Sequence, residues 1–203
     1  MTGSPLYLID DEEPIRRSLG LVLKLAGHEV TAYATGAAFL GEVDALPMGC
    51  ILLDIRMPEM NGLEVQHELV RRGIAMPIVM MTGHGDVATA VSALQAGADD
   101  FIEKPFERAT ILDAIEHACL RTHDPRAYRN MVTQAAQALR ALSDRELAAL
   151  EAFARGASNQ AAASALGVDV AAIESGRAAT MEKLGVAGLA DAVRILYLAR
   201  RTV

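Results

Sequence analysis

Short apolar runs recur through the first 120 residues, and a longer amphipathic segment follows each one. The runs cover residues 5–9, 29–33, 50–53, 77–81 and 100–102. The third and fourth runs are apolar throughout, as is typical of strands that are covered on both faces of a parallel sheet. Five such strands, separated by helical segments, predict a doubly wound α/β domain with a five-stranded parallel sheet.

The chain changes character after residue 121. The sequence Thr122-His123-Asp124-Pro125 interrupts the helical pattern, and the Ala-rich stretch that follows has no strand signal. From Leu142 onward, residues that cap helices and glycines that end them divide the chain into four helices. A short second helix and a glycine turn before the third indicate a helix-turn-helix unit. We therefore expect a first domain over residues 1–121, a partly helical linker over 122–141 and a small all-α domain of four helices over 142–203.

Composition excludes several classes of protein. The chain is 52% hydrophobic and 22% charged, as is typical of folded domains and not of disordered chains. No apolar stretch approaches the ~20 residues that span a bilayer, and the N-terminus lacks the basic and apolar regions of a secretory signal. We expect a cytoplasmic protein with no membrane partner, in which Cys50 and Cys119 are reduced core thiols.

The negative charge is unevenly distributed. Residues 142–203 hold seven Lys+Arg and seven Asp+Glu, so the net charge of −7 falls on residues 1–141. The acidic part is therefore not a surface for nucleic acid, and the C-terminal part is not strongly basic.

Polar side chains lie where the predicted strands end. Asp10 and Asp11 follow the first strand, Asp54 ends the third, Thr82 ends the fourth and Lys104 follows the fifth. Ligands of doubly wound sheets bind outside the carboxyl ends of the strands, so we expect these groups at one rim. Three acids in one pocket repel one another unless a cation lies between them, and their hard oxygens suit Mg²⁺.

Each of these residues also has an ordinary structural explanation. An Asp pair after a strand commonly caps a helix, a Thr at a strand end reflects β propensity, and a Lys before Pro commonly lies in a solvated loop. The conjunction of all five groups favours a site for phosphoryl transfer to Asp54. In this interpretation Thr82 and Lys104 hold the phosphoryl oxygens, and Gly83 leaves room for them.

The motifs resemble those of two-component response regulators and are similar to the FixJ branch. Residues 5–121 resemble a receiver domain, which has a flavodoxin-like fold, and residues 142–203 resemble a LuxR-type helix-turn-helix domain. The receiver motifs are Asp10-Asp11, Asp54 with Met57-Pro58 and Asn61-Gly62, Thr82-Gly83, and Lys104-Pro105-Phe106. The motifs of the helical domain are Leu142-Ser143-Asp144-Arg145-Glu146, Gly156, Asn159, Leu166-Gly167-Val168 and Lys183-Leu184-Gly185.

The resemblance implies a chemistry for the rim. Asp54 would accept a phosphoryl group from a phosphohistidine of a sensor histidine kinase. Asp11, Asp54 and the main-chain oxygen of Arg56 would bind Mg²⁺, and Asp10 would act on it through water. The chain would not otherwise be an enzyme: its only reactions would be magnesium-dependent self-phosphorylation from a phosphodonor and autodephosphorylation.

The resemblance also implies a switch. Thr82 would move toward the phosphoryl group and Phe101, at the position of the family's switch aromatic, would turn inward; the alternative for Phe101 is an ordinary core aromatic. Arg56 and His84 would tune how long the phosphoryl group survives. Phosphorylation would favour a homodimer that binds promoter DNA, with RNA polymerase as a further partner.

The helix expected to read DNA departs from the family pattern. Its candidate contacts are Ala172, Glu174, Ser175, Arg177 and Lys183, whereas family members often carry Thr and Lys at the first two positions. Few basic residues imply weak attraction to DNA phosphates.

Two hypotheses therefore stay open. The chain is a phosphorylation-activated transcription regulator whose dimer compensates for weak half-site binding. Alternatively, the degenerate helix-turn-helix acts through a protein partner or the receiver acts as a phosphate sink, with weak or no DNA binding. A hydrolase acting on small substrates is disfavoured, because no substrate domain is inserted in the chain.

Overall fold

The computed structural model describes residues 5–83 and 87–201. The chain forms two compact units, Met1–Asp124 and Pro125–Val203. The boundary thus lies a few residues beyond residue 121, where we predicted the first domain to end. Most of the segment predicted as a partly helical linker, 122–141, is helix and belongs to the second unit.

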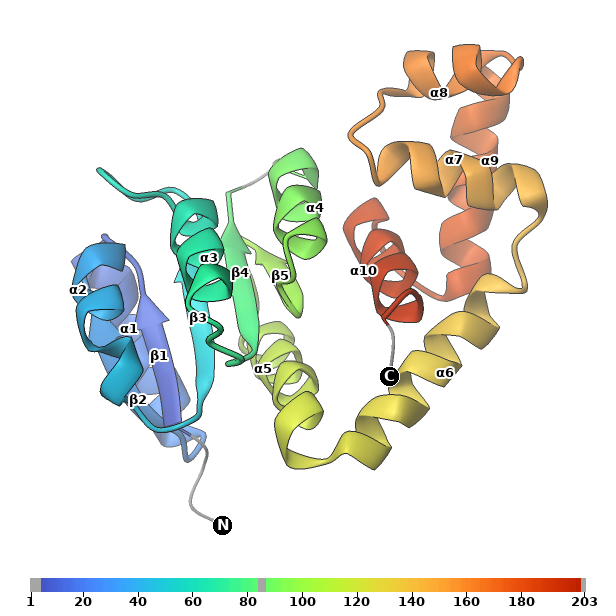
Figure 1. The fold of residues 1–203 in the computed structure, drawn as a ribbon. Coiled ribbons are helices and arrows are strands. Elements are labelled where there is room, and N and C mark those ends of the chain that lie inside the picture. Colours follow the sequence, from blue (N-terminus) through green and yellow to red (C-terminus); the bar gives the residue numbers. More distant parts are fainter. Residues whose placement is uncertain (1–4, 84–86, 202–203) are drawn as a thin grey trace. The chain divides into compact units, whose positions relative to one another are not determined.

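A five-stranded sheet forms the centre of the first unit (Figure 1). Its strands are β1 (Pro5–Ile9), β2 (Glu29–Tyr33), β3 (Cys50–Asp54), β4 (Ile78–Thr82) and β5 (Asp100–Glu103). They lie in the order β2-β1-β3-β4-β5, and every neighbouring pair is parallel. The predicted doubly wound α/β fold is confirmed. All residues of β3 and β4 are buried, as expected for strands with helices on both faces.

Helices cover both faces of this sheet. They are α1 (Glu13–Leu25), α2 (Gly36–Glu42) with the short 3₁₀ helix η1 (Val43–Ala45), α3 (Gly62–Arg71), α4 (Val87–Gln95) and α5 (Arg108–His123). The helices α1 and α5 share one core, in which Leu23 and Ile115 pack with Leu8 and Leu52 of the strands. On the other face, Gln66 Nε2 of α3 donates a hydrogen bond to the carbonyl oxygen of Ala93 of α4, at 2.9 Å.

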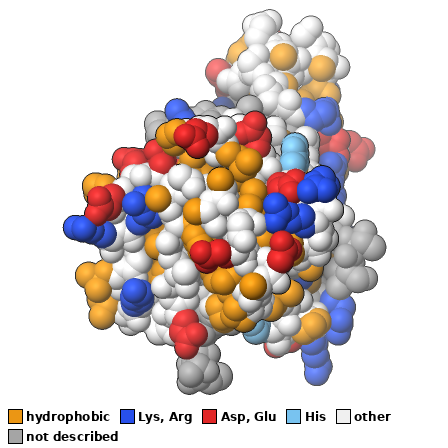
Figure 2. Space-filling model, turned by 60° about the vertical axis from the view of Figure 1, so that its left-hand side comes forward, with side chains coloured by type: hydrophobic (Ala, Val, Ile, Leu, Met, Phe, Trp, Pro, Cys, Tyr) orange, Lys and Arg blue, Asp and Glu red, His pale blue; other side chains and the backbone are white. Residues whose placement is uncertain are grey.

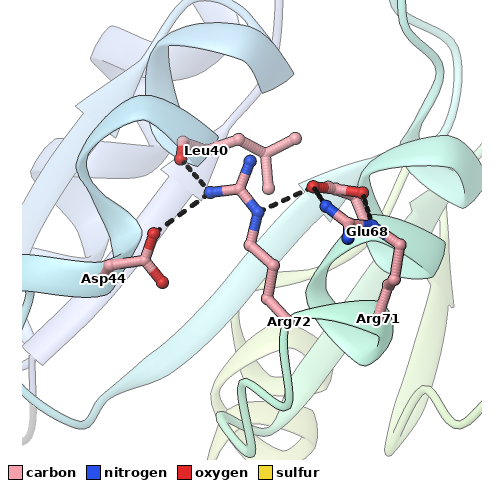
Figure 3. A network of polar contacts seen from close by, with 5 residues as sticks. All are labelled: Leu40, Asp44, Glu68, Arg71 and Arg72. Carbon is pink, nitrogen blue, oxygen red and sulfur yellow. Dashed lines mark hydrogen bonds and ion pairs between the residues drawn. The ribbon is translucent and has the colours of Figure 1, made fainter.

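Arg72, at the end of α3, joins this helix to α2 and to η1 (Figure 3). Arg72 Nη1 donates to the carbonyl oxygen of Leu40 at 2.7 Å and to Asp44 Oδ2 at 3.2 Å. Its Nε donates to Glu68 Oε1 at 2.7 Å, and Arg71 binds both oxygens of the same carboxylate. The two guanidinium groups hold the pKa of Glu68 at about 2.

On the face shown in Figure 2, acidic and basic side chains are interspersed with hydrophobic ones.

The second unit is entirely helical within its described residues. It contains α6 (Pro125–Leu139), α7 (Asp144–Phe153), α8 (Asn159–Leu166), α9 (Val170–Leu184) and α10 (Leu189–Ala199). The last four are the predicted helix-turn-helix domain, and α6 packs against α10. None of the helices in the described ranges is long and apolar enough to cross a membrane.

Local sequence explains where these last helices begin and end. The side chains of Ser143, Ser158 and Asp169 accept hydrogen bonds from main-chain N–H groups in the first turns of α7, α8 and α9. Gly167 and Gly185 end α8 and α9 with φ of 67°, a left-handed conformation that costs glycine little. The limits of the helices in the helix-turn-helix are therefore set by capping residues that can be recognised in the sequence.

Candidate functional site

The five predicted rim residues lie at the carboxyl edge of the sheet. Asp10, Asp54 and Thr82 are buried, with 0%, 5% and 2% of their surface exposed. Asp11 and Lys104 are half-buried. The main-chain N–H of Lys104 donates to the carbonyl oxygen of Thr82 at 2.7 Å, which brings the end of β5 beside the end of β4. Because the strands are parallel, residues that lie at the ends of different strands form one cluster.

The side chain of Lys104 links two of the acids. Its Nζ lies 2.8 Å from Asp10 Oδ2 and 2.6 Å from Asp54 Oδ1. The side chain of Lys104 is only 20% exposed and those of both acids are almost fully buried, so water screens these ion pairs weakly. The repulsion between Asp10 and Asp54 is therefore offset by a cation from the chain itself.

The pKa values in this cluster reflect opposing effects. Burial raises the pKa of Asp54 above its ordinary value, and the hydrogen bond from Lys104 acts in the opposite direction. For Lys104, burial alone would lower the pKa, but the hydrogen bonds to Asp10 and Asp54 leave it raised. Lys104 therefore remains a cation at neutral pH, and its charge supports the ionised, nucleophilic form of Asp54.

Main-chain contacts hold Asp10 in place. The N–H of Glu12 donates to Asp10 Oδ1 at 2.9 Å, and Arg16 Nη1 donates to the carbonyl oxygen of Asp10 at 2.7 Å. We did not predict a role for Arg16 or Glu12 from the sequence. The only available signal was the position of Arg16 in the first turns of the helix after Asp10.

The donor set at the rim consists of oxygens, which fits Mg²⁺. The carboxylates of Asp10 and Asp54 both contact Lys104 Nζ, and Asp11 follows Asp10 in the chain. Within residues 5–83 and 87–201, no three His, Cys, Asp or Glu side chains already form a metal-binding group. The ammonium of Lys104 lies where the two nearest acids converge, so those two oxygens are engaged by a charge of the same sign as a metal ion.

The loop after β3 approaches the site closely. The N–H of Gly62 donates to the carbonyl oxygen of Ile55 at 2.9 Å, and a Cβ at Gly62 would collide with the carbonyl oxygen of Asp54. At Gly83, a Cβ would collide with the guanidinium of Arg56. We expected Gly83 to leave room for phosphoryl oxygens; in this structure the side chain of Arg56 lies against it. Arg56 thus reaches from the loop after β3 to the end of β4.

The other predicted switch and tuning residues are placed as follows. Phe101 is 3% exposed in β5, where it pairs with Met80 of β4. Thr82 ends β4 one residue before Gly83. His84 lies outside the described residues.

The five candidate DNA contacts do not share one exposed face of α9. Ala172, Glu174 and Ser175 are exposed, and Asn159 Nδ2 donates to Glu174 Oε1 at 3.2 Å. Arg177 is half-buried and lines a small cavity between α7, α9 and α10. Lys183 is exposed but pairs with Glu146 at 2.7 Å, near the end of the helix. The first half of α9 therefore presents alanines, a serine and an acid.

Comparisons with known proteins cover almost the whole chain. Residues 6–116 match the family described as response regulator receiver domain, and residues 140–196 match bacterial regulatory proteins of the luxR family. The chain is 38% identical to the transcriptional regulatory protein FixJ of Azorhizobium caulinodans over 96% of its own length and 92% of the relative. It is 34% identical to the response regulator protein TodT of Pseudomonas putida, over 95% and 85%.

Solved structures agree with this assignment. Full-length FixJ from B. japonicum matches over 98% of both chains, with 35% identity and a TM-score of 0.60. The structure described as FixJ-N matches 58% of this chain and 94% of its own, with 43% identity and a TM-score of 0.56. The chain therefore belongs to the two-component response regulators with a LuxR-type domain, and is a transcription regulator controlled by phosphorylation.

Proposed function

We propose that Asp54 is the phosphoacceptor and that its donor is the phosphohistidine of a sensor histidine kinase. A carboxylate oxygen of Asp54 attacks phosphorus, and the bond from phosphorus to the histidine nitrogen breaks as the new P–O bond forms. The observation that carries the proposal is the ion pair of 2.6 Å between Lys104 Nζ and Asp54 Oδ1. It favours the ionised form of a buried nucleophile and holds a cation where negative charge arrives.

Asp10, Asp11, Asp54 and the main-chain oxygen of Arg56 would hold Mg²⁺. When bound, the ion would neutralise the acids and stabilise charge on the transferred phosphoryl group. Lys104 would exchange part of its contact with Asp54 for a phosphoryl oxygen, and the hydroxyl of Thr82 would hold another. The same site supports slow self-phosphorylation from a small phosphodonor.

Loss of the phosphoryl group requires water to reach phosphorus. Arg56 lies against Gly83 at the end of β4, so its guanidinium occupies space beside the site. We assign Arg56, together with His84, to the control of this water attack.

Phosphorylation would change the positions of Thr82 and Phe101, and this change would favour a homodimer that binds DNA. Two helical domains in one dimer would add their DNA contacts, which compensates for the small phosphate-neutralising charge of each. Ala172, Glu174 and Ser175 on the exposed face of α9 would meet base edges in the major groove. DNA and RNA polymerase are then the downstream partners.

Replacement of the acceptor tests the first proposal. Asp54→Asn should abolish acid-labile labelling by a phosphorylated sensor kinase, while Asp113→Asn, an exposed acid of α5, should be labelled like the parent chain. Persistent labelling of Asp54→Asn at the parent rate would refute the assignment.

A second candidate function rests on the exposed face of α9. Its first half offers Glu174 and alanines in place of cationic side chains, so a protein partner or a phosphate sink, with weak or no DNA binding, is the alternative output. A gel-shift experiment with the phosphorylated chain, across a library of genomic fragments at moderate salt, separates the two. Selective retardation of some fragments supports the transcription regulator; no selective fragment supports the alternative.

A further inference from the structure

The two cysteines of the chain lie together beneath α5. Cys50 is the first residue of β3 and is 1% exposed; Cys119 is a half-buried residue of α5. Cys50 belongs to the core shared by α1 and α5, and Cys119 packs against that core. The two side chains interact, and this interaction shifts the pKa of each thiol. We expected two unconnected core thiols from the sequence, which separates them by almost 70 residues.

Only one of the two thiols has a route to solvent. Cys119 lines an open cavity of about 390 Å³ together with Ala26, His28, Glu116 and His123. Cys50 does not line this cavity, and it lies buried in the core beside Leu6 of β1. A small polar reagent therefore reaches Cys119 first.

Their interaction also makes the two sulfurs unequal. The interaction with Cys50 lowers the pKa of Cys119, against the effect of burial. The interaction with Cys119, together with burial, raises the pKa of Cys50. The more accessible sulfur thus has the greater thiolate character, which is the form that attacks oxidants.

We propose that Cys50 and Cys119 form a reversible intramolecular disulfide when the chain meets a hydroperoxide. The thiolate of Cys119 attacks the peroxide, the O–O bond breaks, and the leaving alkoxide or hydroxide takes a proton; Cys119 becomes a sulfenic acid. The sulfur of Cys50 then attacks the sulfur of Cys119, the S–O bond breaks, and hydroxide leaves with the proton of Cys50 as water. Two thiols lose two electrons, and the hydroperoxide is reduced to an alcohol (or water) and water.

A metal ion is the other ligand that a thiol pair suggests. In the described part of the chain, no third His, Cys, Asp or Glu joins the two sulfurs in a metal-binding group. Two ligands are too few for the tetrahedral sites that thiolates favour, so redox chemistry is the better assignment.

The crosslink has a defined mechanical consequence. Cys50 begins β3 and Asp54 ends it, so the disulfide ties α5 to the strand that carries the proposed phosphoacceptor. It also closes a loop of roughly 70 residues in the unfolded chain, which stabilises the receiver.

Peptide mapping of the full chain tests the proposal. The reduced chain is treated with hydrogen peroxide at neutral pH, denatured, labelled with a maleimide and digested. We expect both thiols to be lost together, a mass lower by two hydrogen atoms per chain, and a peptide with Cys50 linked to one with Cys119. Dithiothreitol should restore both thiols. Free Cys50 beside an oxidised Cys119, or two thiols that stay reduced, would overturn the proposal.

Two variants identify which sulfur reacts first. Cys50→Ala should leave Cys119 as a sulfenic acid that a cyclic 1,3-diketone traps, whereas Cys119→Ser should leave Cys50 reduced under the same dose. Trapping at Cys50 in the second variant, as fast as at Cys119 in the first, would contradict the order of steps. Because the mapping above uses the parent chain, the proposal remains testable if a variant folds poorly.

Discussion

Lys104 Nζ lies 2.6 Å from Oδ1 of Asp54 and also pairs with Asp10, whose position in the chain is 94 residues away. The ammonium thereby joins the ends of β1 and β3 through a residue that follows β5. This contact ties the charge of the proposed nucleophile to the residue that would later hold the phosphoryl group.

Removal of the Lys104 ammonium should slow phosphorylation of Asp54. Lys104→Met keeps much of the side-chain volume but deletes a buried charge-assisted hydrogen bond, worth about 1.5–3 kcal/mol, so we expect a rate about 10–100-fold lower. The measurement is the rate constant of labelling from a small acyl phosphate with magnesium. Lys24→Met, at an exposed site of α1, is the control. Equal rates for the two variants would argue against this role for Lys104.

Gly62 and Gly20 should respond in opposite directions to alanine. The Cβ of Gly62→Ala collides with the main chain of Asp54, so we expect a loss of about 1–3 kcal/mol. At Gly20, inside α1, a Cβ meets nothing within 4 Å, so Gly20→Ala should stabilise the receiver by about 0.5–1 kcal/mol. Hydrogen exchange of the β3 amides measures the change in the free energy of unfolding for both variants. A neutral Gly62→Ala would show that the loop after β3 yields easily.

Glu146 should give the second unit a stability that depends on acid pH. Hydrogen bonds from Lys183 and from Ser143 lower the pKa of Glu146 to about 2, from an ordinary value of 4.5. Because the folded value is the lower one, the stabilisation is complete above pH 4.5 and is lost as the pH falls toward 2. An NMR titration of the side-chain carboxyl carbon checks this.

The partner lysine provides the comparison for Glu146. In Lys183→Met the midpoint should move back toward 4.5, while the remaining capping hydrogen bonds with Ser143 keep it somewhat below that value. A midpoint for Glu146 that does not move would show that Lys183 contributes nothing.

Glu174 should limit the affinity of α9 for DNA. Glu174→Lys replaces an anion by a cation on the exposed face, so we expect tighter binding and a slope of log K against log salt that is steeper by about one or more. Glu116→Lys makes the same change of charge on α5 of the receiver. Equal slopes for the two variants would place the first half of α9 away from the DNA phosphates.

The sequence by itself determined the architecture of both units. Unbroken apolar runs at 50–53 and 77–81 require a sheet that is covered on both faces, and parallel strands place Asp10, Asp54, Thr82 and Lys104 at one edge. Caps and glycines, such as Ser158 and Gly167, fixed the limits of the last helices. These features depend on residues that are close in the chain, so the sequence alone is enough to predict them.

Only the tertiary structure decided which groups touch. Lys104 bridges two acids, Arg56 lies against Gly83, and Lys183 pairs with Glu146 across 37 residues. Cys50 and Cys119 become partners because α5 packs over the first residue of β3. A motif places a residue at a strand end or on a helix, but the contacts of its side chain depend on neighbours that only folding brings near.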